Sequence, residues 1–172
     1  MALLTAAFVL HVLSAAFWTG STLYVVYAVV PAARTGRLST ELFVDNCHRL
    51  LLITRWTGVV IPLTGAYMIW VLYTPLELLT ATARGWAVLV MIGLWGGMNA
   101  LIELGVLRMR RAVDDVGLAA YMTEGFPSGT LSEPPSGRRP ELVGLVRPYL
   151  LGAAGCAVLL LVDAALLAGG GV

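Results

Sequence analysis

The histidine at position 11 has a side chain that ligates metal ions and carries protons near neutral pH. It lies in the middle of a long apolar stretch, residues 3–30, and a helical rise places it about 12 Å from the nearer edge of a bilayer core. Ser14, Trp18 and Thr22 follow it at spacings of three, seven and eleven residues, on one helical face. We expect this face to point into a helical bundle. There His11 binds copper or haem iron, carries a proton, or forms a hydrogen bond that only stabilises the core.

Three sulfur-containing side chains, those of Met68, Met91 and Cys156, fall in the same half of the predicted membrane region. Cu(I) favours thioether, thiolate and imidazole ligands, so these residues and His11 form our candidate metal site. Packing is the alternative role of the methionines, and the chain has no CxxC or HxxxH spacing. The other histidine, His48, is predicted at the opposite boundary, about 15–20 Å away in depth. One chain therefore should not supply both ligands of a bis-histidine haem. A haem with one histidine ligand, or a dimer that uses His11 twice, is compatible with the sequence.

Three charged residues are predicted at one depth, about 6–7 Å inside the inner boundary: Arg55, Glu103 and Arg147. We expect them to form an intramembrane ion cluster that holds the ends of three helices together, because unpaired charge is costly in hydrocarbon. A site for an anionic group is the alternative. Asn99, one turn from Glu103, is expected to hydrogen-bond between helices. Asp163 is placed near the outer end of the last helix.

The composition of the chain requires a membrane. Of its 172 residues, 59% are hydrophobic and only 12% are charged, with a mean hydropathy of +0.85. An average soluble domain has about 25% charged residues. The net charge of +1 gives no basic surplus for nucleic acid, so we expect the lipid bilayer and no nucleic acid as partner. Since all eleven basic residues are arginine, lysine chemistry is excluded, and no set of catalytic residues is identified.

Four apolar stretches are long enough to cross a bilayer as helices: residues 3–30, 42–73, 86–107 and 142–167. We expect one all-α domain, an up-and-down bundle of four transmembrane helices. Pro31 is predicted to end the first helix, and Ser39 with Glu41 to begin the second. After the third span, residues 108–122 continue the helix and residues 123–141 form a flexible cytoplasmic linker rich in proline.

The arginines predict the orientation of the bundle. Eight of the eleven lie in the first and third connections, and only Arg84 lies in the connection on the other side. Both termini are therefore expected outside, in a multi-pass protein of the cytoplasmic membrane. Glycines at helical spacing predict close helix contacts: Gly58 and Gly65, Gly93 and Gly97, and Gly152 and Gly155. A homodimer through the face of Gly93 and Gly97 is an alternative.

The segment from His11 through Trp18 and Gly20 to Pro31 resembles the first helix of the CopD-like (copper resistance D) family of small integral membrane proteins. Arg55 and the pair Thr64 and Gly65 resemble that family's second helix. The resemblance covers the first two spans. It implies a protein that handles or transports copper across the cytoplasmic membrane, with His11 as candidate ligand.

A more distant resemblance is to the four-helix HemJ type, which is associated with protoporphyrinogen oxidation and haem b. His11 matches the histidine of its first helix. That type also uses a lysine at the start of helix three, where this chain has Arg84, and arginine does not replace lysine chemically. The sequence thus leaves three functions open: copper handling, a haem-binding membrane oxidoreductase, and an accessory membrane subunit without chemistry.

Overall fold

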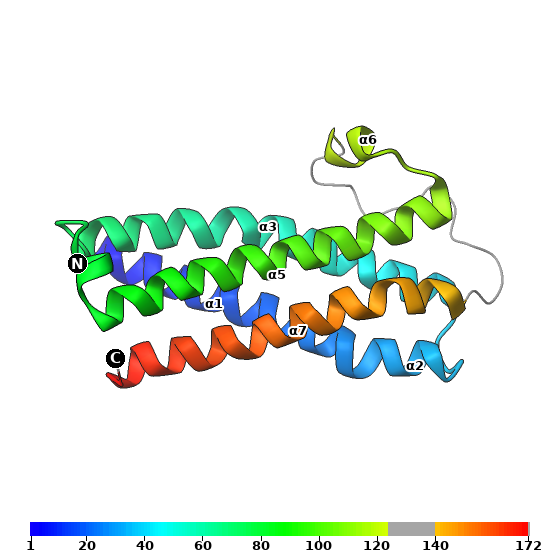
Figure 1. Cartoon of the computed structure of the whole chain (residues 1–172), viewed down its shortest axis with the longest axis horizontal. Helices are drawn as coiled ribbons and strands as arrows, with labels where there is room; N and C mark the ends of the chain where they lie inside the picture. Colours follow the sequence, from blue (N-terminus) through cyan, green and yellow to red (C-terminus); the bar gives the residue numbers. More distant parts are fainter. Residues whose placement is uncertain (124–139, 172) are drawn as a thin grey trace.

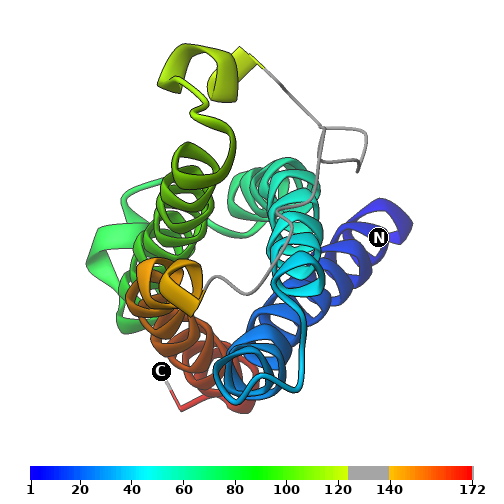
Figure 2. The same cartoon turned by 90° about the vertical axis from the view of Figure 1, so that its right-hand side faces the viewer.

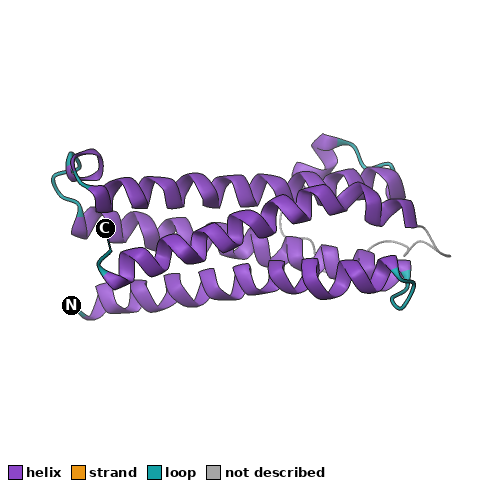
Figure 3. Cartoon of the chain, turned by 60° about the horizontal axis from the view of Figure 1, so that its bottom comes forward, coloured by secondary structure: helices purple, strands orange, loops and turns teal. Residues whose placement is uncertain are grey.

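The computed structural model describes residues 1–123 and 140–171, and within them it contains helices and no strand (Figures 1 and 3). Four helical segments are long and apolar enough to cross a membrane: Ala2–Arg34, Thr40–Leu72, Ala83–Val113 and Pro140–Gly169. Each agrees with one predicted span, and each extends beyond it at one or both ends. The predicted all-helical architecture with four spans is confirmed. The linker predicted at residues 123–141 lies almost entirely outside the described residues.

The first span continues through Pro31, where the sequence predicted its end. It consists of α1 (Ala2–Tyr24), a π-helical segment η1 (Val25–Val29) and α2 (Val30–Arg34). The amide of Val30 bonds to the carbonyl of Val25, five residues back, so the turn before the proline is widened. We attribute the continuation to this turn, which relieves the contact between a proline ring and the carbonyl four residues earlier.

The second span, α3 (Thr40–Leu72), begins where predicted, because the Ser39 hydroxyl accepts a hydrogen bond from the amide of Leu42 at 3.2 Å. A single turn, α4 (Leu78–Ala81), leads to the third span, α5 (Ala83–Asp114). Asp115 then takes a left-handed backbone conformation, with φ of 51°. A continuous helix to residue 122 was predicted, and it is wrong: the chain turns at Asp115.

After this turn, the short helix α6 (Leu118–Thr123) lies beside the end of α5 (Figure 1). The last span, α7 (Pro140–Gly169), returns along the bundle. Figure 2, which looks along the bundle, shows the four spans around a common axis in the order α1, α3, α5, α7. Consecutive spans run in opposite directions, and α1 packs mainly along α3 and α5 mainly along α7.

Both chain termini lie at the same end of the bundle (Figure 1), which we call the terminal end. The opposite end, which holds the connection from α2 to α3 and helix α6, is called the arginine end. Large apolar side chains cover the outside of the helices between the two ends, among them Phe17, Leu63 and Trp70, which are 60%, 67% and 77% exposed. Such a surface fits contact with lipid, as expected for a multi-pass membrane protein.

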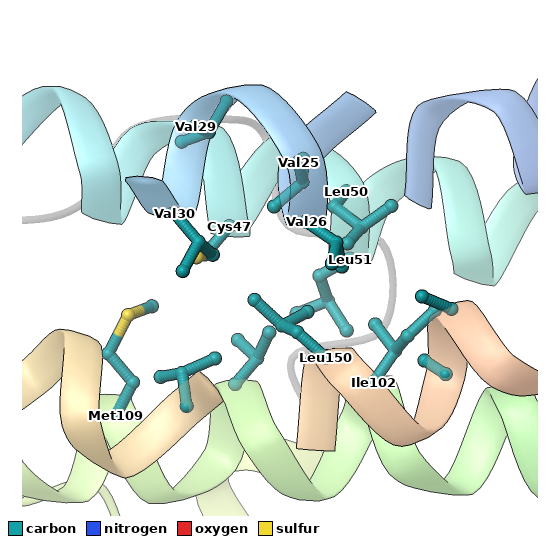
Figure 4. Close-up of a cluster of buried hydrophobic side chains, with 14 of the residues drawn as sticks. Val25, Val26, Val29, Val30, Cys47, Leu50, Leu51, Ile102, Met109 and Leu150 are labelled. Carbon is teal, nitrogen blue, oxygen red and sulfur yellow. The ribbon is translucent and has the colours of Figure 1, made fainter. Parts of the chain in front are cut away.

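The hydrophobic core occupies the half of the bundle near the arginine end. Valines of η1 and α2 meet Leu50 and Leu51 of α3, Ile102 of α5 and Leu150 of α7 there (Figure 4). The core ends at the level of Ile61, Met98 and Ala157. Between this level and the terminal end, Ala7 is the one buried apolar side chain among the described residues. The helices near the terminal end are therefore less tightly packed against one another.

The glycine contacts agree with the predicted ones in part. A Cβ on Gly58, Gly65 or Gly152 would lie 3.1–3.3 Å from a side chain of a neighbouring helix. A Cβ on Gly93 would meet nothing within 4 Å, and one on Gly97 would lie 3.9 Å from the sulfur of Cys156. The shortest of these distances between α5 and α7 is at Gly105, where a Cβ would lie 2.9 Å from Cβ of Tyr149. Close packing at Gly105 joins these two helices, while the face of Gly93 stays open.

Candidate functional site

His11 is half-buried on α1 and joins this helix to α3. Its Nδ1 lies 2.9 Å from the hydroxyl oxygen of Thr64. The same hydroxyl donates to main-chain carbonyls of its own helix, with oxygen–oxygen distances of 2.7 Å to Val60 and 3.0 Å to Ile61. The imidazole thus meets a threonine whose orientation is fixed by the backbone of α3.

This arrangement determines which ring nitrogen of His11 carries the proton. A hydroxyl has one proton, and the backbone carbonyls of α3 already accept the proton of Thr64. The Thr64 oxygen therefore accepts a hydrogen bond, and Nδ1 of His11 is the donor. In the neutral imidazole the lone pair then resides on Nε2. A hydrogen bond that fixes the tautomer and the ring orientation is the usual support of a histidine that ligates a metal through its other nitrogen.

A second pair, farther toward the arginine end, repeats this geometry. The indole Nε1 of Trp18 lies 2.9 Å from the hydroxyl oxygen of Thr54, and that hydroxyl donates to the carbonyl of Leu50 at 2.8 Å. Here the direction is certain, because an indole can only donate. Trp18 is 1% exposed, so this pair belongs to the packed core. The His11 pair differs because its aromatic ring retains a nitrogen lone pair.

Gly65 leaves the space that the imidazole occupies. A Cβ at this position would lie 3.2 Å from Cε1 of His11, which is closer than ordinary van der Waals contact. The neighbouring pair Thr64 and Gly65 thus supplies both the acceptor for Nδ1 and the room for the ring. The sequence singled out this pair only through a family resemblance, and its contact with His11 gives it a physical role.

The other predicted metal ligands lie on three different helices. Met68 is one turn beyond Thr64 on α3, on the same helical face and nearer the terminal end. Met91 is half-buried on α5, and Cys156 on α7 faces Gly97 at the seam between α5 and α7. His11 is at the other seam, between α1 and α3. Within residues 1–123 and 140–171, no group of three histidine, cysteine or acidic side chains is arranged to hold a metal ion.

The second cluster of polar residues lies nearer the arginine end. Nε of Arg55 on α3 donates to Oε1 of Glu103 on α5 at 2.9 Å, and Nη2 donates to Oε2 at 3.2 Å. The two side chains therefore form a two-pronged ion pair between the helices, with Arg55 12% and Glu103 31% exposed. This geometry uses the planar guanidinium group in a way that lysine does not reproduce.

Tyr121 of α6 completes this cluster, and the sequence did not predict its role. Its hydroxyl donates to Oε2 of Glu103 at 2.5 Å, and the guanidinium carbon of Arg55 lies 4.9 Å from the centre of its ring. The side chain is 1% exposed, although α6 lies outside the spans. Burial, followed by the hydrogen bond and the negative charge of Glu103, raises the pKa of Tyr121 far above its ordinary value, while Arg55 acts in the opposite direction.

Arg147, the third predicted member of the ion cluster, lies elsewhere. Its neighbours Val146 and Leu150 are buried, whereas Arg147 is exposed on another face of α7, beside Arg34. The structure thus brings together Arg55 and Glu103 and places Arg147 at the surface. Residues at one depth need not share a direction around the helix axis, because neighbouring positions point about 100° apart.

Three further polar residues show different environments. The side-chain amide of Asn99 donates to the carbonyl of Trp95 in its own helix, and its oxygen approaches Gly58 of α3. His48 is 2% exposed and lies in the core, where the sequence suggested an interfacial position. Asp163 is half-buried near the terminal end of α7.

No family model, no curated protein and no solved structure matches this chain. Functional inference therefore depends on the two clusters themselves.

Proposed function

We propose that this chain is an integral membrane protein that handles copper, and that Nε2 of His11 binds Cu(I) as it passes through the membrane. The observation that carries the proposal is the 2.9 Å contact between His11 Nδ1 and the Thr64 hydroxyl. Because that hydroxyl donates to carbonyls of α3, we assign the ring lone pair to Nε2. Neutral imidazole is a favourable copper ligand, and a fixed tautomer avoids the cost of reorienting the ring when the ion binds.

Of the candidate soft ligands, the thioether of Met68 is the one on α3, the helix that His11 contacts. It shares a face of α3 with Thr64, and the side chain of a helical residue leans toward the N-terminus of its helix. His11 on α1 therefore leans toward the terminal end, the direction in which Met68 lies beyond Thr64. Met91 and Cys156 would join the path from α5 and α7. Here the copper ion is cargo, held by few ligands so that it can also leave.

Thr64 provides the experiment, since Thr54 is its matched control. Thr64→Val removes the acceptor for His11 Nδ1, and Thr54→Val removes the equivalent acceptor for Trp18. Purified protein is titrated with Cu(I) under reducing conditions against a competing chromophoric chelator. We expect Thr64→Val to weaken binding about 10–100-fold, the usual cost of losing such a supporting contact. Thr54→Val should leave affinity unchanged. Equal effects of the two substitutions would mean that helix packing, and not the imidazole, controls binding.

A second candidate function is a haem b protein with His11 as its single axial ligand from this chain. The observation in its favour is the position of the core, which ends near Ile61, Met98 and Ala157. Between that level and the terminal end, a planar macrocycle would fill the space where the helices have few buried side chains in contact. Haem would supply redox chemistry, while His11 and Thr64 would hold its iron. A visible spectrum with a Soret band after expression with haem supply favours this candidate. Purified protein that binds neither copper nor haem favours an accessory subunit.

We also propose an orientation in the cytoplasmic membrane, based on the excess of arginine in two of the connections. The arginine end lies in the cytoplasm, and both termini lie outside. Thr35 and Leu76 are exposed in connections at opposite ends, so each serves as a labelling site when changed to cysteine. Cys47 is buried, and Cys156 is replaced by alanine to leave one reactive thiol. In intact cells a membrane-impermeant maleimide should label Leu76→Cys and not Thr35→Cys. The reverse pattern would refute the orientation.

A further inference from the structure

A groove between α2 and α7 at the arginine end is not part of either polar cluster. Its volume is about 380 Å³, and α2 and the first turns of α7 lie side by side around it (Figures 1 and 2). Seven residues line it: Arg34, Pro140, Val143, Gly144, Arg147, Pro148 and Leu151. Its wall is thus apolar apart from two arginines, one contributed by each helix.

Among the described residues that line the groove, none is acidic. Both arginines are exposed. The nearest acid in sequence, Glu141 in the first turn of α7, is exposed and does not line the groove. The first turn of a 30-residue helix adds a positive dipole end at Pro140. The groove is therefore electropositive.

The two arginines of the groove lie near the end of the membrane-spanning segments, close to the expected headgroup region. Arg34 is in the last turn of the first span, and Arg147 is about 10 Å along α7 from Pro140. Long arginine side chains at such positions extend toward the headgroup region. Pro148 and Leu151 line the groove beyond Arg147, toward the middle of the span. A molecule with an anionic head and an apolar chain fits both parts, whereas a soluble anion fits only the first.

We propose that this groove binds the phosphate of an anionic phospholipid, with Arg34 and Arg147 as its two cationic contacts and the acyl chain along Pro148 and Leu151. The two guanidinium groups donate to phosphate oxygens from opposite sides, as in basic pockets between membrane helices. The site joins α2 to α7, and it is independent of copper or haem at His11.

Lipid retention by the intact protein tests the proposal. Delipidated protein in detergent is titrated with phosphatidylglycerol or phosphatidylcholine, and bound lipid is counted by native mass spectrometry. We expect one phosphatidylglycerol to bind in preference to phosphatidylcholine. Arg34→Gln and Arg147→Gln should each lower its affinity about fivefold. The control Arg111→Gln, an exposed arginine of α5 outside the groove, should have no effect. An equal loss in the control would reduce the site to general surface charge and overturn the proposal.

Filling the groove without changing charge is an independent test. A Cβ on Gly144 would meet nothing within 4 Å, and the same is true of Gly155 farther along α7, outside the groove. Gly144→Leu should lower phosphatidylglycerol affinity at least fivefold, and Gly155→Leu should not change it. Unchanged affinity in Gly144→Leu would contradict binding of the lipid in this groove.

Inorganic phosphate distinguishes a lipid from a soluble ligand. At millimolar concentration and constant ionic strength, it should not displace phosphatidylglycerol, because it lacks the apolar chain. Displacement that depends on Arg34 and Arg147 would instead identify a site for a soluble phosphate and overturn the lipid assignment.

Discussion

The hydroxyl of Tyr121 donates to the carboxylate of Glu103 at 2.5 Å, and this contact ties a helix outside the spans to the interior of the bundle. Glu103 is at the same time the ion-pair partner of Arg55 on α3. One carboxylate therefore connects α3, α5 and α6 near the arginine end. Buried polar groups of this kind stabilise a fold when each has its partner and destabilise it when one is removed.

Replacing Tyr121 with phenylalanine should lower the free energy of unfolding by about 1–2 kcal/mol, because a buried hydrogen bond to a charged group is lost while the ring remains. Unfolding in detergent micelles, followed by circular dichroism, measures this change. Tyr27→Phe is the control, since Tyr27 is 70% exposed. A loss of the same size at Tyr27 would contradict a specific role for the Tyr121 hydroxyl.

The raised pKa of Tyr121 makes this contribution depend on pH. The folded state holds the phenolic proton more tightly than the unfolded chain, whose tyrosine ionises near pH 10. The stabilisation is fully present below pH 10 and decreases as the pH rises above it, because only the unfolded state then releases the proton. Between pH 9 and pH 11, the free energy of unfolding should decrease more in wild type than in Tyr121→Phe. Parallel slopes would show that this phenol does not titrate as described.

Arg55→Lys should destabilise the protein by about 1–3 kcal/mol, although it keeps the charge. Lysine cannot contact both carboxylate oxygens of Glu103 through a planar fork, nor lie over the ring of Tyr121 in the same way. The control is Arg49→Lys. Arg49 forms an ion pair with Asp45 and is 71% exposed, so its change should stay within about 0.5 kcal/mol. Thermal unfolding of both variants in the same detergent gives the comparison. Equal stability of Arg55→Lys and wild type would contradict a stabilising role of the two-pronged contact between Arg55 and Glu103.

Gly65→Ala should displace the imidazole of His11, because the new methyl group would lie 3.2 Å from Cε1. We expect weaker copper binding with little loss of helix content, since alanine is a better helix former than glycine. Gly96→Ala is the control, because a Cβ there would meet nothing within 4 Å. Cu(I) competition titrations provide the measurement. Equal affinities of the two variants would show that the ring position does not limit binding.

Hydropathy and length predicted the spans, because about 20 apolar residues are needed for a helix to cross the hydrocarbon core. Local backbone changes were harder to predict. The helix continues through Pro31 because of a widened turn at η1, and it breaks at Asp115 because of a left-handed residue. Neither feature has a strong periodic signal. Gly117, two residues after Asp115, was the available indication of a break.

The site was predictable to the extent that one helix determines it. The face of His11 and Trp18 follows from helical spacing, and both residues do contact α3. The identities of their partners, Thr64 and Thr54, depend on how α1 and α3 are aligned along each other, which spacing within one helix does not determine. Arg147 was predicted in one cluster with Arg55 because the two residues have the same depth in the membrane, but depth does not determine the direction of a side chain around the helix axis. Tyr121 was missed because its role requires the chain reversal after α5.

Copper binding by wild type and His11→Ala is the most direct test of the central claim. The two proteins are purified in parallel under reducing conditions, loaded with Cu(I), desalted, and analysed for metal per chain and for a visible haem spectrum. The account predicts bound copper in wild type, its loss in His11→Ala, and unchanged insertion and helix content in the variant. Copper retained in full by His11→Ala would contradict the proposed site.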